Sequence, residues 1–335
     1  MAGNEPLEMK SWEGGLRLGL CCQFIDQPIK FRTTTAAALV RMPRCEQLNR
    51  LSALCSANAD TLRAALAFCA MHEIGSFRIL STILPVKTHP VVGYRIEQLP
   101  DAERIVAQFR QCGDFARKYS IRTGFHPDQF VVLNSPNPAI VASSQAEIES
   151  QAELAEWTHA DTVNVHGGGG YGNKIAALDR FARSLDGLSP RARSRLTVEN
   201  DDKTFTPADL LPLCLKTGIP MVYDVHHHRC LPDHLSVEEA TEAARNSWNR
   251  EPLFHVSSPV QGWQGPKPSR HHDFIDPADF PATWLGWPVT VEVEAKAKEL
   301  AVARLGEDLR KASASLRGLP GAVARGLQRG QTKAL

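Results

Sequence analysis

The fold is decided by RLTVENDD, residues 195–202, together with IPMVYDVHHHR, residues 219–229. Each stretch is a short apolar run rich in strand-forming residues, and each run closes on a carboxylate, Glu199 or Asp224. Between them, Thr206-Pro207 is typical of a helix start and Gly218 of a helix end. The order strand, helix, strand predicts a unit of a parallel sheet.

Eight such apolar runs alternate with helical segments along the chain. Eight repeats predict one α/β domain, a (β/α)8 TIM barrel, over residues 16–310. Residues 1–15 are expected to be an N-terminal extension and 311–335 a basic, flexible tail, while Asp60 and Asp101 are candidate helix N-caps. The predicted strands are Arg17–Cys22, Phe77–Leu80, Arg122–Phe125, Thr162–Val165, Arg195–Val198, Pro220–Tyr223, Leu253–Val256 and Val289–Val293.

Composition excludes several classes of protein. Of 335 residues, 43% are hydrophobic and 22% charged, which is ordinary for a globular protein. The formal net charge of +1 means that a nucleic acid would have to be bound by a local basic patch. Eight cysteines without a CxxC pair suggest neither a zinc ribbon nor a disulfide framework, and no apolar stretch is long enough for a membrane span. We therefore expect a cytoplasmic protein with no membrane association and no obligate protein partner.

Seven of the eight predicted strands lead to a histidine, aspartate or glutamate. In a barrel of this type the carboxyl ends of the strands meet at one face, where functional groups collect. Imidazoles and carboxylates in this number suit Zn²⁺ or Mn²⁺, and they exceed what one ion needs, so two or three ions are expected. Such a cluster can activate water and neutralise a phosphodiester, which indicates backbone hydrolysis. The residues are His89, His126, His166, Glu199, Asp224, His226 to His228, His255, His271, His272, Asp273, Glu292 and Glu294.

Structural roles remain open for part of this set. A lone histidine beside a core is more often hydrogen-bonded than metal-bound, and the neighbours His226, His227 and His228 cannot all face one cluster. Glu199 and Asp224 are different, because an ionised carboxylate that closes an apolar run is costly unless it is paired or metal-bound. The glycine run 167–170 with Lys174 is either a phosphate-binding loop or only a tight turn.

In this context the sequence resembles the UV damage endonuclease family of metal-dependent barrel enzymes. The resemblance runs from about Arg17 to Leu300 and includes several motifs in order. They are FRILSTILPVKTHP (77–90), GFHPDQFVVLNSP (124–136), VNVHGGGGYGNK (163–174), LTVENDD (196–202), IPMVYDVHHHR (219–229), HVSS (255–258), HHDFI (271–275) and EVEAKAKE (292–299).

The resemblance implies nicking of double-stranded DNA immediately 5′ to a pyrimidine dimer, a 6-4 photoproduct or an abasic site. It implies Mn²⁺ as the ion, with Zn²⁺ or Mg²⁺ still open, and Glu199, Glu294 and Lys296 as candidate catalytic residues. Gln129 and Phe130 resemble a pair that wedges into the duplex opposite a flipped lesion, and Lys174, Lys203 and Arg270 are candidate DNA contacts. The implied metal ligands are His89, His126, His166, Glu199, Asp224, His227, His255, His271 and Glu294.

Three positions depart from the family pattern, in which Leu20 and Phe130 are usually tyrosines and Leu253 is a lysine that can become a metal-bridging carbamate. Leucine cannot bridge metals, so the number of ions and the lesion range are open. Two other functions stay under consideration. One is a sugar isomerase or epimerase of related architecture, because fold and metal do not dictate substrate. The other is a barrel that binds damage without cutting.

Overall fold

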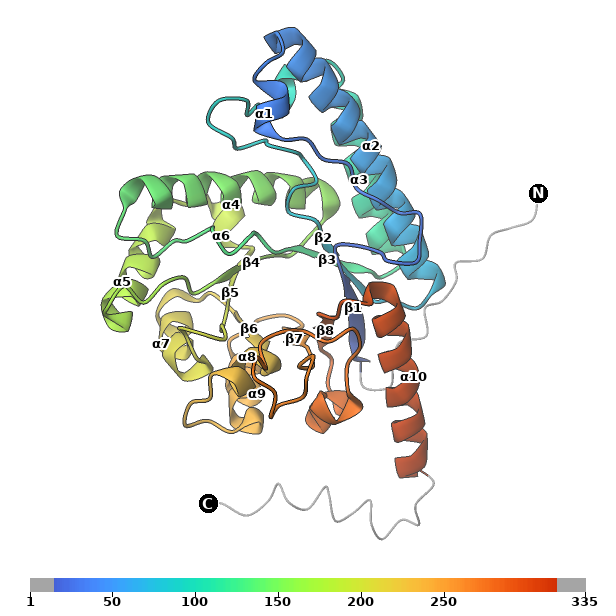
Figure 1. The fold of residues 1–335 in the computed structure, drawn as a ribbon, viewed down its shortest axis with the longest axis vertical. Coiled ribbons are helices and arrows are strands. Elements are labelled where there is room, and N and C mark those ends of the chain that lie inside the picture. Colours follow the sequence, from blue (N-terminus) through green and yellow to red (C-terminus); the bar gives the residue numbers. More distant parts are fainter. Residues whose placement is uncertain (1–14, 318–335) are drawn as a thin grey trace, which may run out of the picture.

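The eight strands form one closed parallel barrel in sequence order, β1 to β8, in which β8 pairs back onto β1. The computed structural model of the protein describes residues 15–317, and Figure 1 shows the barrel surrounded by its helices. The strands are β1 Arg17–Cys21, β2 Ser76–Ile79, β3 Arg122–Phe125, β4 Thr162–His166, β5 Leu196–Glu199, β6 Met221–Asp224, β7 Leu253–Val256 and β8 Thr290–Val293.

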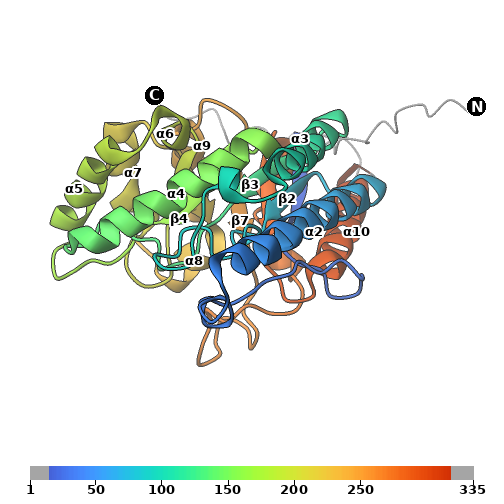
Figure 2. The same ribbon diagram turned by 90° about the horizontal axis from the view of Figure 1, so that it is seen from above.

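Helices follow the strands and cover the outside of the barrel, as the view turned by 90° also shows (Figure 2). The α-helices are α1 Ala36–Leu39, α2 Arg44–Met71, α3 Ala102–Lys118, α4 Pro138–Thr158, α5 Lys174–Ser184, α6 Pro190–Arg193, α7 Pro207–Thr217, α8 Val225–Cys230, α9 Val237–Asn246 and α10 Lys298–Arg317. Short 3₁₀ turns are η2 Ile96–Gln98, η3 Leu185–Gly187, η4 Pro277–Asp279 and η5 Ala282–Gly286. No helix among the described residues is long and apolar enough to span a membrane.

The predicted barrel is confirmed, and each predicted strand overlaps the observed one closely. Helix α7 begins and ends as predicted, with Thr206 as its N-cap and Gly218 in a left-handed conformation at its end. The prediction that Asp60 caps a helix is wrong, because α2 continues through it. Helix α10 extends to Arg317, past the predicted boundary at residue 310, and the rest of the predicted tail lies outside the described residues.

The two ends of the barrel interior differ in chemistry. At the amino ends of the strands, Leu253 packs with Val222 and Trp248 in an apolar cluster. At the carboxyl ends, Glu199, Asp224 and His255 are each fully buried, although all three are polar. Side chains alternate along a strand, so the same strands β6 and β7 supply an apolar residue at one level and a polar residue two positions later.

Candidate metal centre

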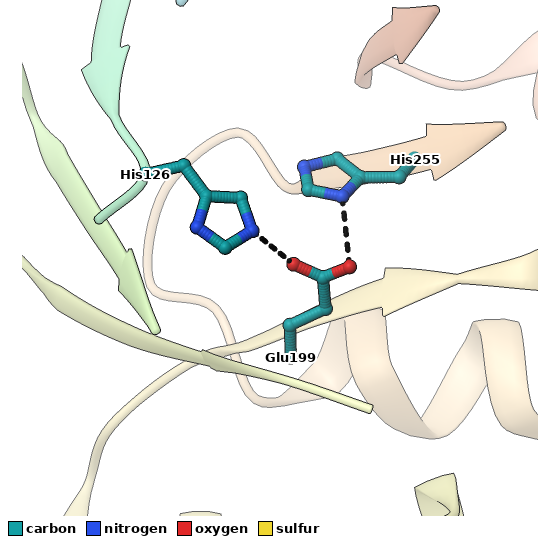
Figure 3. A group of neighbouring side chains, drawn as sticks. All are labelled: His126, Glu199 and His255. Carbon is teal, nitrogen blue, oxygen red and sulfur yellow. Dashed lines mark hydrogen bonds and ion pairs between the residues drawn. The ribbon is translucent and has the colours of Figure 1, made fainter. Parts of the chain in front are cut away.

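Glu199 lies at the centre of the polar cluster at the carboxyl ends of the strands. Its Oε2 accepts hydrogen bonds from Asn164 Nδ2 at 2.6 Å and His126 Nε2 at 2.8 Å, and its Oε1 lies 3.1 Å from His255 Nδ1. Figure 3 shows this carboxylate between the two imidazoles, one oxygen toward each. Three strands therefore converge on a single carboxylate that is fully buried.

Asp224 and His227 form the second part of the cluster, and the short helix α8 positions both. Asp224 ends β6 and caps α8, because its Oδ1 accepts the His227 backbone N–H at 2.7 Å. This turn brings His227 Nδ1 to 3.3 Å from Glu199 Oε1 and 3.5 Å from Asp224 Oδ2. The buried Oδ2 of Asp224 has no hydrogen-bond partner among the described residues.

Glu294 follows β8 and completes the cluster on the opposite side. Its Oε1 lies 3.5 Å from His255 Nδ1, and its Oε2 lies 3.9 Å from His271 Nδ1. His271 comes from the long loop after β7, where it forms an isolated β-bridge with Pro259. Its side chain is less buried than that of Glu294, so it lies at the edge of the cluster.

Six of the nine expected ligands belong to three overlapping groups whose ligand atoms lie within 4.8 Å of one another. The groups are His126 with Glu199 and His255, Glu199 with Asp224 and His227, and Asp224 with His255 and Glu294.

The other three expected ligands belong to none of these groups. The His166 ring lies 4.9 Å from that of His126, and its buried Nδ1 has no hydrogen-bond partner among the described residues. His89 Nδ1 accepts the backbone N–H groups of Val91 and Val92, which leaves only its Nε2 for another contact.

The electrostatics of the cluster couple its acids to its imidazoles. Burial opposes ionisation of Glu199, but the neighbouring histidines, His255 first, outweigh it and hold the pKa of Glu199 well below its usual value. Burial likewise opposes the charged form of His255, yet the surrounding carboxylates raise its pKa to about 10. For His166 burial dominates and lowers its pKa, so this ring favours the neutral form. Without a cation, protons on histidines balance the buried carboxylates.

The residues fit a site for divalent cations. Deprotonated carboxylates and neutral imidazoles are the ligands that Zn²⁺ and Mn²⁺ prefer. Six side chains of these two kinds lie close together here. Asp224 Oδ2 and His166 Nδ1 are buried polar atoms without a hydrogen-bond partner among the described residues, and such atoms are costly. Protonated histidines would offset the negative charge of the carboxylates. A protonated ring nitrogen has no free lone pair, however, and cannot bind a cation.

The cluster opens into a cavity of about 330 Å³. Gln129 and Lys203 lie on its wall, and so do Gly168 and Gly169 from the glycine run. Asn134 fixes that run by donating to the carbonyls of Gly167 and Gly169 and accepting the Gly169 N–H. The Gly169 backbone N–H therefore already has a hydrogen-bond acceptor within the protein.

Phe130 follows Gln129 in the loop after β3 and is 77% exposed. Its backbone N–H is held by Asp128 Oδ1 at 3.2 Å, while its ring extends into solvent. The ring is therefore not packed into the loop, and its exposure leaves it free to contact a partner.

The expected cationic contacts are placed differently from one another. Lys174 pairs with Asp209 at 2.8 Å. Lys203, Arg270 and Lys296 are exposed, and no ion pair joins their side chains to another described residue. Lys296 lies two residues after Glu294, which belongs to the cluster.

Two of the departures from the family pattern lie away from the cavity. Leu20 is fully buried in the hydrophobic core, so it offers no surface to a ligand. Leu253 lies in the apolar cluster at the amino ends of the strands. A leucine at either position is explained by packing.

Sequence patterns pointed to Glu292 but not to Arg78 and Asn164, which are also buried polar residues of the barrel strands. Asn164 donates to Glu199, while Arg78 pairs with Glu292 and also with Glu294. Each interrupts an otherwise apolar strand, which is the signal that could have identified them. Glu292 and Glu294 are two residues apart in an extended segment, so they face the same side.

A family model described as UV-endonuclease UvdE matches residues 16–322. The UV DNA damage endonuclease of Deinococcus radiodurans is 34% identical over 300 residues, which covers 86% of this chain and 94% of that protein. The crystal structure of SacUVDE has a TM-score of 0.79 and 27% identity, and the match covers 89% of this chain and 99% of that one.

A D-psicose 3-epimerase from Clostridium cellulolyticum H10 matches at a TM-score of 0.53 and 12% identity, over 89% of this chain and 98% of that one. This likeness shows a shared fold alone. The match of sequence and structure over nearly the whole length is with the UV endonucleases, and the chain belongs to the UvdE family.

Proposed function

We propose that this protein is a metal-dependent endonuclease that nicks the DNA backbone immediately 5′ to a lesion and so starts excision repair. The observation that carries the proposal is the buried cluster of carboxylates and imidazoles that opens into a cavity. The relatives named UV DNA damage endonuclease support DNA as the substrate. Pyrimidine dimers, 6-4 photoproducts and abasic sites are the lesions proposed.

Two or three divalent cations are proposed to bind at this cluster, with Mn²⁺ as the preferred ion. Glu199, Asp224, His227, His255 and Glu294, together with His126, would hold them, and His166 and His271 lie at the edge of the same cluster. When bound, such cations polarise water and neutralise phosphate oxygens. His89 is the least supported of the proposed ligands, because no contact joins it to the cluster within the part of the chain described.

The chain's own residues are proposed to hold the substrate around this centre. Gln129 lines the cavity and the next residue, Phe130, is exposed, so the pair is proposed to fill the gap left when damaged nucleotides leave the stack. Stacking on an aromatic ring is sequence-tolerant, because every base has a π-face. This suits an enzyme that recognises damage rather than sequence.

Backbone contacts are proposed for Lys203 on the cavity wall and for Arg270 and Lys296, whose side chains are exposed. Lys174 would first have to leave Asp209. Contacts of this kind release counterions, so affinity for duplex DNA should fall steeply as salt rises. Affinity that stays flat between low and physiological salt would favour a small-molecule substrate instead.

A reducing cytoplasm is the proposed compartment. All eight cysteines are free, and five of them are buried, which is the pattern of unpaired structural thiols. A protein partner is not part of the proposal.

The test is incubation of the purified protein and Mn²⁺ with a duplex oligonucleotide that carries one defined lesion. A nick immediately 5′ to the lesion, dependent on Mn²⁺ and absent from the undamaged duplex, is expected. Selective binding to the lesion duplex without a nick would instead identify a barrel that only binds damage. Absence of both, with turnover of a sugar, would identify an epimerase-like enzyme.

A further inference from the structure

A buried ion pair spans the barrel interior directly beside the candidate ligands. Arg78 in β2 donates from Nε to Glu292 Oε2 in β8 at 2.5 Å, and both side chains are nearly fully buried. β1 lies between these strands and pairs with both, and it carries Gly19 opposite Ser76 and Glu292. A Cβ at Gly19 would lie 3.1 Å from Glu292 Cγ, so the glycine leaves room for the Glu292 side chain.

The pair contacts two of the candidate ligands. Arg78 Nη1 lies 2.6 Å from Glu294 Oε1, and Arg78 Nη2 lies 2.9 Å from His255 Nε2. Glu292 Oε2 lies 3.1 Å from the same His255 Nε2. The other ring nitrogen, His255 Nδ1, faces Glu199 at 3.1 Å and Glu294 at 3.5 Å. One edge of this imidazole therefore faces the cluster, and the other faces the ion pair.

The chemistry of the two neighbours decides which nitrogen can bind a cation. A neutral imidazole carries its proton on one nitrogen and offers a lone pair on the other. For His255 to offer Nδ1 to the cluster, Nε2 must keep its proton and needs an acceptor. Arg78 has donors only, and its contact with Nε2 at 2.9 Å is a hydrogen bond only in the opposite tautomer, so Glu292 is the neighbour that favours a proton on Nε2.

We propose that Glu292 is a positioning residue that accepts the Nε2–H of His255 and thereby directs the Nδ1 lone pair toward the ligand cluster. Arg78 holds Glu292 in place and offsets its charge, which would otherwise lie buried near Glu294. Carboxylate–histidine pairs of this kind orient metal-binding imidazoles in many sites. The proposal rests on the proposed function, in that it requires the cluster to bind divalent cations.

A purely structural role for the pair makes different predictions. If Glu292 only balances Arg78, removal of both charges together should not weaken cation binding, because it only frees the Glu294 carboxylate from Arg78. If Glu292 orients His255, the same double change should weaken cation binding without loss of the fold. Replacing a buried ion pair by apolar residues of similar size is often neutral for stability, which makes this comparison practicable.

The test uses Zn²⁺, which is diamagnetic, with protein labelled with ¹⁵N in its histidines. Three proteins are compared with the parent: Glu292→Gln, the double variant Arg78→Met with Glu292→Met, and the control Glu299→Gln. Glu299 is a matched control because it is also a buried carboxylate, but it accepts backbone N–H groups of Ile25 and Asp26 instead. Zn²⁺ affinity is measured by competition with a chelator, and the ¹⁵N shifts assign the protonated nitrogen of His255.

In the parent, His255 should bind Zn²⁺ through Nδ1 and carry its proton on Nε2. The double variant should bind Zn²⁺ about 10–100-fold more weakly, which is the usual loss when such a partner is removed. Glu292→Gln keeps an acceptor oxygen, so it should lose less, and Glu299→Gln should match the parent. Parent-like affinity in the double variant, or Zn²⁺ on Nε2 in the parent, would overturn the proposal. A parent that binds no Zn²⁺ would instead overturn the proposed metal centre, and this inference with it.

Discussion

The two ends of this barrel contain buried or half-buried charges, but the charges are satisfied in different ways. At the amino ends, Asp161 pairs with both Arg122 and Arg250, and an apolar cluster fills the interior. At the carboxyl ends, acids and imidazoles crowd together, and Asp224 Oδ2 and His166 Nδ1 lack hydrogen-bond partners among the described residues. The first arrangement pairs each charge within the fold, whereas the second gathers side chains that could hold a metal ion. In barrels of this kind, chemistry belongs to the carboxyl end and stability to the other.

The largest effect should follow Glu199→Gln at the carboxyl end. Glu199 contacts three histidines. Loss of its charge should lower Mn²⁺ affinity and reduce the nicking rate by at least ~100-fold, which corresponds to about 2.7 kcal/mol in activation free energy. The melting temperature of the metal-free protein should change by no more than about 4 °C, or roughly 1 kcal/mol. Bound Mn²⁺, nicking rate and melting temperature are measured together.

A matched control for this variant lies at the opposite end. Glu251 is a glutamate with a partly buried side chain, and it binds Arg17 and Thr290 instead of the cluster. Glu251→Gln should keep Mn²⁺ binding and nicking at the parent level. Retention of both properties in Glu199→Gln as well would remove Glu199 from the proposed ligands.

A change at the amino end should lower stability and leave metal binding unchanged. Asp161→Ala leaves Arg122, with a side chain only 10% exposed, without its carboxylate partner. Because Asp161 itself is about one-third exposed, we expect a loss of about 1–3 kcal/mol in the free energy of unfolding. Mn²⁺ affinity should stay unchanged. Denaturant unfolding and metal titration test this, and a loss of Mn²⁺ binding at parent-like stability would contradict the division between the two ends.

How far the sequence predicts these two ends depends on the range of the interactions. Glu199, Asp224 and His255 directly close or interrupt apolar runs, so a local pattern placed them at strand ends. Arg78 and Glu292 meet only because the barrel closes across 214 residues, which no local pattern encodes.

Positions in loops and long helices were also beyond local patterns. The distances of His89 and His271 from the cluster depend on loop paths, which spacing in the sequence does not determine. Asp60 resembled a cap but lies inside α2, where its side chain accepts a hydrogen bond from Gln108 of α3. A polar residue tolerated on a helix surface looks the same in sequence as one that begins a helix.

A third, smaller effect concerns the rim of the carboxyl end. Phe130→Ala should weaken binding to lesion duplex by about 1–3 kcal/mol, the range for base stacking on an aromatic side chain. Since the ring is exposed, the melting temperature should stay close to that of the parent. Affinity for undamaged duplex and for lesion duplex is measured side by side. Equal weakening on both, or a large drop in melting temperature, would show that Phe130 has no selective role.

Dissolved bicarbonate is expected to have no effect on nicking or on Mn²⁺ affinity. Leu253 lies among apolar side chains at the amino ends and has no amine to form a carbamate, so nicking and Mn²⁺ affinity should not respond to bicarbonate. Activity that rises with bicarbonate and falls on degassing would show that a different lysine supplies the group.

Cations are proposed to bind at the carboxyl end of the barrel interior and not at its amino end. The most direct measurement is anomalous diffraction at the manganese edge from crystals grown with Mn²⁺. Two or three peaks are expected among Glu199, Asp224, His227, His255 and Glu294. No peak at these side chains at saturating Mn²⁺, or peaks only elsewhere in the molecule, would contradict it.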